Sequence, residues 1–179
     1  MSSKAMLVGG LASILTIPIW ILVVVLVPDF DFTKASPLAN AVLVAGSIAT
    51  MLAFGGLYYL FSGRSPLNAF MLGLGVVGIG LTLIPTDPPW SYNAGSILWG
   101  GALLIAGYLL RDSHAIWLSW LGLVVGALFV LIGVVGFTGP KNLADTVNMV
   151  SAIPAFVWAA WIGWVLVKKS RELAPASTG

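Results

Sequence analysis

The chain contains no cysteine, one histidine and few charged residues, and these scarcities exclude several classes of function. Without cysteine there can be no disulfide, thiolate nucleophile, zinc–thiolate site or iron–sulfur cluster. A single histidine excludes a haem held by two histidines of the same chain. Only 8% of the residues are charged, whereas soluble proteins have about a quarter. A water-soluble globular fold is therefore not expected.

Apolar sequence dominates instead, with 59% hydrophobic residues and a mean hydropathy of +1.04. Six continuous apolar runs cover residues 5–27, 37–61, 66–85, 93–110, 115–137 and 145–167. Each is close to the ~20 residues that cross a ~30 Å hydrocarbon core as a helix. We therefore predict an all-α fold, a polytopic membrane bundle of six transmembrane helices. One domain would span residues 1–179 and end in a short polar tail at 168–179.

Basic residues mark the ends of the predicted helices and suggest an orientation. Short loops that carry Lys and Arg tend to stay on the cytoplasmic side of a membrane. With residue 1 in the cytoplasm, the inner side carries Lys4, Arg64, Arg111, Lys168, Lys169 and Arg171, and the outer side only Lys34 and Lys141. We predict cytoplasmic termini in a multi-pass protein of the cell membrane. Because the basic residues flank membrane runs, the net charge of +2 does not indicate binding of nucleic acid.

The run at residues 67–90 is rich in glycine and ends in a proline-rich loop. At about 100° per residue, its small residues fall on two opposite sides of a helix, with Ala69, Gly73 and Gly80 on one side and Gly75, Gly78 and Thr82 on the other. In lipid, helices associate by close approach at such small residues. We therefore predict that this run is the central helix of the bundle.

Glycines are also predicted to mediate packing elsewhere. Residues 73–78 match the spacing G-x-G-x-x-G of dinucleotide-binding loops, but no strand precedes them, so helix packing is the favoured interpretation. The run at 115–137 contains a G-x-x-x-G spacing of its own. The candidate packing residues are Gly73, Gly75, Gly78, Gly80, Gly122 and Gly126.

Two prolines at similar depth in the first and last runs point to a candidate polar pocket. Counted from the predicted cytoplasmic ends, Pro18 and Pro154 lie roughly 18 to 20 Å deep. Broken helices at the midplane form binding sites in many transporters. The candidate pocket residues are Ser13, Thr16, Pro18, Asn148, Ser151 and Pro154. The alternative is that these prolines are ordinary kinks whose freed carbonyls bond to nearby Ser or Thr.

Acidic residues in the predicted outer loops form a second candidate site. The carboxylates are those of Asp29, Asp31, Asp87 and Asp145. A hard cation such as Ca²⁺ accepts carboxylate and carbonyl oxygens from flexible loops. The alternative is that Asp145 caps the last helix and the other three are solvated. No spacing typical of a calcium loop is present, so we expect no metal and no cofactor.

The layout resembles the prokaryotic six-helix integral membrane proteins grouped as domain-of-unknown-function family 998. The resemblance rests on Val27-Pro28-Asp29-Phe30, Ser36-Pro37-Leu38, and Gly78-x-Gly80 leading to Ile84-Pro85-Thr86-Asp87. It implies six helices and no established activity. The segment from Trp90 to Gly95 lacks the histidine looked for after the proline–aspartate turn, so no catalytic role is carried over.

No ionisable residue lies deep in any run, which argues against proton-coupled transport and intramembrane hydrolysis. The favoured hypothesis is a non-catalytic accessory or structural subunit of a larger membrane complex. Its partners would be lipid and another protein or a second copy. Trp158, Trp161 and Trp164 would then face lipid or that partner. The alternative is a transporter or binder of a neutral or amphipathic small molecule between the first and last helices. A third hypothesis is an enzyme that acts on lipid head groups.

Overall fold

A computed structural model describes residues 2–27, 36–86, 88–112 and 116–174 and shows an all-α fold. Within these ranges there are six helices and no strand. The helices are α1 (Ser2–Leu26), α2 (Pro37–Leu60), α3 (Leu67–Thr82), α4 (Trp90–Leu110), α5 (Ile116–Thr138) and α6 (Lys141–Glu172). They confirm the predicted all-helical bundle. Most predicted boundaries are within a few residues of these, and α6 is longer at both ends.

Local sequence accounts for several helix boundaries. At the start of α2 the side chain of Ser36 accepts a hydrogen bond from the backbone N–H of Ala39, and proline occupies the first turn. The connection between α2 and α3 turns at Gly63, whose φ of 78° is a conformation that glycine adopts without strain. After α3, Pro85 disfavours helical geometry at the residue before it.

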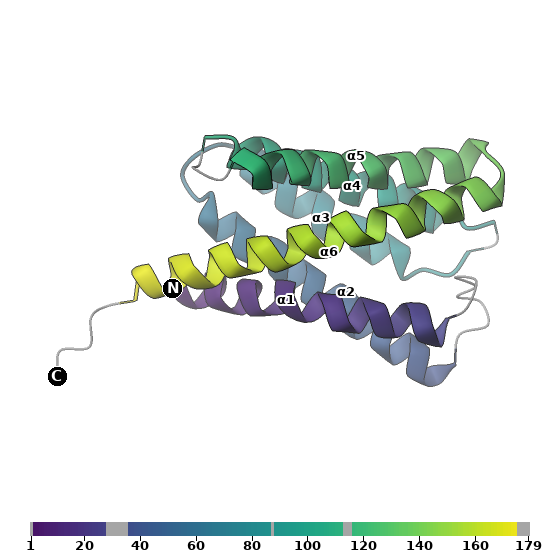
Figure 1. The fold of residues 1–179 in the computed structure, drawn as a ribbon, viewed down its shortest axis with the longest axis horizontal. Coiled ribbons are helices and arrows are strands. Elements are labelled where there is room, and N and C mark those ends of the chain that lie inside the picture. The colour runs from purple at the N-terminus through teal and green to yellow at the C-terminus, as the bar shows by residue number, and fades with distance from the viewer. Residues whose placement is uncertain (1, 28–35, 87, 113–115, 175–179) are drawn as a thin grey trace.

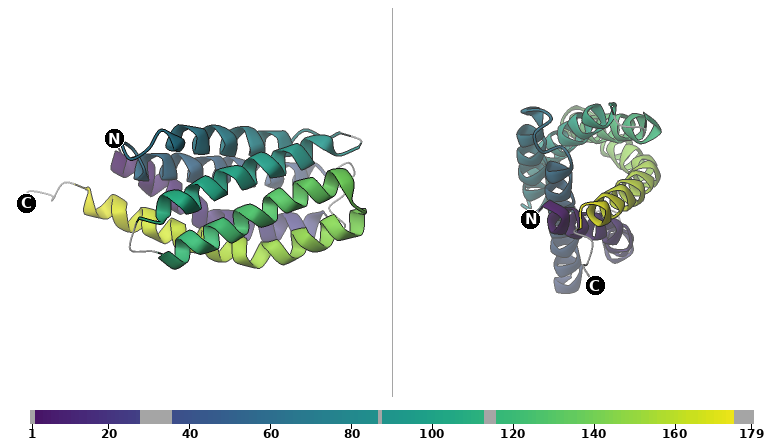
Figure 2. Two further views of the ribbon diagram at one scale, coloured as in Figure 1. Left: turned by 90° about the horizontal axis from the view of Figure 1, so that it is seen from above. Right: turned by 90° about the vertical axis from the view of Figure 1, so that its left-hand side faces the viewer.

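The helices follow one another around a ring in chain order, and α6 closes the ring by packing against α1 (Figures 1 and 2). The terminal end of the bundle carries the first residue of α1 and the last residue of α6, and the opposite end is called the loop end. The predicted central position of α3 is wrong, because α3 packs between α2 and α4 as one member of the ring. Its two small-residue sides do not both meet neighbours.

The surroundings of the glycines on α3 show why its two small-residue sides do not both pack against other helices. A Cβ on Gly75 would lie 2.8 Å from the ring of Phe54 on α2, and one on Gly78 would lie 2.6 Å from the backbone N of Trp99 on α4. By contrast, no atom lies within 4 Å of a Cβ built on Gly73, and only Met51 of α2 comes within 4 Å at Gly80. The predicted packing role of Gly73 within the chain is therefore wrong. On α5, Gly122 lies against Trp158 of α6 and Gly107 of α4, and Gly126 lies against Gly100 and Leu104 of α4.

Five of the six helices are long and apolar enough to cross a membrane: α1, α2, α4, α5 and the Leu143–Glu172 part of α6. The exception is α3, which has 16 residues and spans about 24 Å. Its apolar run was predicted to continue to residue 85. The helix instead ends at Thr82, and the N–H groups of Leu83 and Ile84 bond three residues back in a tighter turn.

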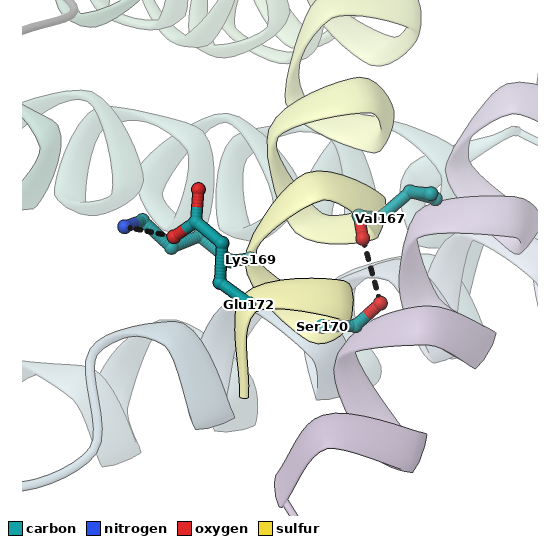
Figure 3. Close-up of polar contacts among 4 residues, drawn as sticks. All are labelled: Val167, Lys169, Ser170 and Glu172. Atoms are coloured by element: carbon teal, nitrogen blue, oxygen red, sulfur yellow. Dashed lines mark hydrogen bonds and ion pairs between the residues drawn. The ribbon is translucent and has the colours of Figure 1, made fainter. Parts of the chain in front are cut away.

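The last turn of α6 combines a buried hydroxyl with an exposed ion pair (Figure 3). Ser170 is buried and donates its hydroxyl proton to the backbone oxygen of Val167 at 2.7 Å. Lys169 donates to a carboxylate oxygen of Glu172 at 2.7 Å, and both side chains are about half exposed. The side of α6 that carries Ser170 therefore stays against the bundle to the end of the helix.

Candidate functional site

The ring encloses a cavity of about 360 Å³, here called the ring cavity, to which all six helices contribute. Most of its wall is aliphatic or aromatic, with a minority of hydroxyl, indole, phenol and amide groups. The polar side chains on the wall are Ser13, Thr16, Trp20, Thr50, Thr82, Tyr92, Trp99, Asn148, Ser151 and Trp158. Among the wall residues that the structure describes there is no Asp, Glu, Lys, Arg or His.

Four of the six residues predicted for the polar pocket lie on this wall. Ser13 and Thr16 come from α1, and Asn148 and Ser151 come from α6. Pro18 is exposed, Pro154 is half-buried, and neither lines the cavity. The structure also places all six helices around the cavity, so it is not a space between the first and last helices alone.

The serine and threonine hydroxyl groups on the wall all donate to backbone carbonyls. Ser13 donates to the oxygen of Ala159 at 2.8 Å, which links α1 to α6. The other four bonds are local to one helix: Thr16 to Ser13 at 2.6 Å, Thr50 to Gly46 at 2.8 Å, Thr82 to Ile79 at 2.7 Å and Ser151 to Asn148 at 2.7 Å. A hydroxyl has one proton and two lone pairs, so each of these groups retains acceptor capacity.

Aromatic side chains connect three helices across the cavity. The rings of Trp20 on α1 and Trp99 on α4 are 6.1 Å apart between centroids, and Trp99 lies 4.5 Å from Phe129 on α5. The indole N–H of Trp20 also approaches the hydroxyl of Thr50 on α2 at 3.4 Å. These tilted pairs give one side of the cavity a continuous aromatic surface.

Trp158 differs from its predicted role. Trp158 was expected to face lipid, but it is 6% exposed and lines the cavity. At about 100° per residue it points about 60° away from Trp161 and about 120° away from Trp164, which do face outward. Tyr92, near the start of α4, also lines the cavity, and its hydroxyl interacts with the side chains of Ser96 and Asn148.

Thr50 was missed altogether, although the sequence carries a signal for it. Leu43, Thr50 and Leu57 recur every seven residues on α2, and all three line the cavity. Residues seven apart lie on nearly the same side of a helix. A heptad search for polar residues among apolar ones would therefore have pointed to this side of α2.

The cavity opens sideways between α1 and α6. Four wall residues are exposed, and all of them belong to these two helices: Ile21, Val24, Val25 and Met149. Val25 is 70% exposed and Met149 67% exposed, which places them at a rim rather than in an enclosed wall. In Figure 1, α6 lies beside α1 near the terminal end and moves away from it towards the loop end. We call the exposed part of the wall at Ile21, Val24, Val25 and Met149 the side opening.

Toward the terminal end, the ring is filled by apolar side chains. One buried cluster includes Phe61, Met71, Leu110, Leu118 and Ile162, from five different segments. The same cluster includes the cavity-lining residues Phe54, Leu57, Leu103, Val125 and Trp158. The ring cavity is therefore bordered by packed core on that side, while its exposed rim lies in the half nearer the loop end.

The predicted acidic cluster is only partly within the described residues. Asp29, Asp31 and Asp87 lie outside them. Asp145 is half-buried on α6, and it does not cap that helix, since Pro140 holds the cap position without a side-chain bond. Within the described ranges, no group of three or more His, Cys, Asp or Glu is arranged to hold a metal ion.

Comparison with known proteins identified no relative of this chain. No family model, no curated protein and no solved structure matches the chain.

Proposed function

We propose that this chain is a multi-pass membrane protein that binds a neutral, largely apolar small molecule in the ring cavity. The observation that carries the proposal is the cavity itself, with its apolar wall and few fixed polar groups. Small-molecule sites usually have volumes of about 300–1,000 Å³ and this mixture of surfaces. The volume of about 360 Å³ is at the lower end of that range and suits one compact or single-chain molecule.

The wall chemistry supports a neutral ligand. Burying an unpaired charge in an apolar site costs far more than burying a hydrogen-bonded neutral group. The described wall offers no formal charge to pair with one. Hydroxyl groups such as those of Thr16 and Ser151, together with the amide of Asn148, can instead hold a neutral polar group.

The position of the side opening supports loading from the membrane. Val24, Val25 and Met149 are apolar and exposed along helices that are apolar enough to span a bilayer. A ligand dissolved in lipid would meet this rim directly. We further propose that the terminal end, with its excess of Lys and Arg, faces the cytoplasm. The side opening, which lies nearer the loop end, would then face the outer leaflet of the membrane.

A binding role is preferred here to the purely structural subunit. A ring whose own side chains leave a cavity gives up the dispersion contacts that a packed core would supply. The exposed aromatic residues near the terminal end, Tyr108, Trp117, Trp120 and Trp164, fit a membrane-interface belt and do not require a protein partner.

Saturable binding in lipid nanodiscs tests the proposal. The purified full chain is titrated with radiolabelled dodecanol and with dodecyl methyl ether, and binding above lipid partitioning is measured. We expect a saturable component near one molecule per chain for at least one probe. Replacing Ala155 on the wall by Phe should abolish it, while Ala160→Phe on the exposed side of α6 should not. Lack of saturable binding of either probe, or equal binding in A155F and A160F, would contradict the proposal.

A further inference from the structure

We infer that the ligand of the ring cavity is a membrane-soluble alcohol, that is, an uncharged molecule with an apolar body and a hydrogen-bond-donating hydroxyl group. The inference rests on the proposed binding function and narrows its ligand class. It comes from the direction of the hydrogen bonds on the cavity wall, which is independent of the cavity's volume.

Each serine and threonine on the described wall has already given its proton to a backbone oxygen. The donors are Ser13, Thr16, Thr50, Thr82 and Ser151, at distances of 2.6 to 2.8 Å. Only the lone pairs of these oxygens remain available to accept a hydrogen bond from a ligand. These five serine and threonine side chains therefore present acceptors in apolar surroundings.

Acceptors of this kind favour a ligand that donates a hydrogen bond. A hydroxyl group on the ligand can bond to the oxygen of Thr16 or Ser151 while the existing bonds stay in place. An ether, ester or ketone brings only acceptors, so to bond with it one of these five hydroxyl groups would have to turn away from its carbonyl. Losing one such hydrogen bond corresponds to an affinity about fivefold to tenfold lower.

The side opening adds a route for such a molecule. Ser151 and Asn148 lie on α6 close in sequence to the exposed rim residue Met149, and Thr16 lies on α1 less than two turns before the rim residue Ile21. An alcohol entering from lipid would meet acceptors soon after passing the rim. Its apolar body would then contact the aliphatic and aromatic wall at Phe54, Leu103 and Val125.

The test compares dodecanol with dodecyl methyl ether by competition on the full chain in nanodiscs. We expect the alcohol to bind about fivefold to tenfold more tightly than the ether. Dodecanoate at neutral pH, which carries a charge, should compete poorly. Equal or tighter binding of the ether would overturn the alcohol assignment and leave the proposed function standing. Failure of both neutral probes to bind saturably would instead contradict the proposed function itself.

A matched pair of serines on α6 can test whether the preference for the alcohol arises from the cavity wall. Ser151 and Ser170 are both buried, and each donates to the carbonyl three residues before it at 2.7 Å, but only Ser151 lines the cavity (Figure 3 shows Ser170). Ser151→Ala or the near-isosteric Thr16→Val should lower dodecanol affinity about fivefold and leave ether affinity unchanged. Ser170→Ala should change neither. If the preference for the alcohol survives both S151A and T16V, the acceptor assignment is wrong.

Discussion

Gly10 of α1 and Gly163 of α6 lie backbone to backbone where the ring closes. A Cβ built on either residue would come within 2.8 Å of the main-chain oxygen of the other. One turn along α1, the hydroxyl of Ser13 donates to the oxygen of Ala159. The closure thus depends on the absence of side chains at one level and on a hydrogen bond at the next.

Replacing Gly163 by Ala should destabilise the bundle. The added methyl group would also lie 2.8 Å from Ile14 of α1, so the two helices must move apart. Such overpacking typically costs about 1–3 kcal/mol, and we expect a lower melting temperature in detergent. Gly73→Ala on α3 is the control, because its methyl group meets no atom within 4 Å. Equal stability of G163A and G73A would show that the helices do not close at this point.

The bond between Ser13 and Ala159 should make a small, measurable contribution to stability. Hydrogen bonds between membrane helices contribute about 0.6 kcal/mol on average. We expect Ser13→Ala to lower the free energy of unfolding by this order, measured by reversible unfolding in mixed micelles. Thr138→Val removes a bond of similar length that is local to α5 and exposed, and it should have less effect. The reverse ranking would contradict an interhelical role for Ser13.

The proposed orientation can be tested with single cysteines, since the chain has none of its own. Pro88 is exposed in the connection between α3 and α4 at the loop end, and Arg171 is exposed at the terminal end. In intact cells, an impermeant maleimide should label Pro88→Cys but not Arg171→Cys. Permeabilised cells should give labelling of both, and the unmodified chain should give none. Labelling of R171C alone in intact cells would invert the proposed topology.

Hydropathy and proline placement were sufficient to predict the six helices. Continuous apolar runs determine where helices form, and the prolines at residues 37, 66 and 85 lie at or within three residues of observed boundaries. The arrangement of the helices could not be predicted in the same way. Small residues permit close approach without specifying a neighbour, so Gly73 and Gly75 looked equivalent in sequence although only Gly75 contacts another helix.

The candidate site was partly predictable for a related reason. Ser13, Thr16, Asn148 and Ser151 were selected because of nearby prolines, yet the prolines do not line the cavity. These polar residues lie on the wall because their sides of α1 and α6 face the interior of the ring. Thr82 comes from a different helix, and a list of residues from two helices cannot include a wall built by six.

The order of helices around the ring has a consequence for biogenesis. Each helix from α2 to α5 packs against the one that precedes it in the chain, so these contacts can form as successive segments leave the ribosome and enter the bilayer. Among the described helices, the contact that closes the ring is the one that α6 makes back to α1. The enclosed space therefore does not exist until α6 has been inserted, and a chain truncated before α6 would present its hydroxyl-bearing surface directly to lipid.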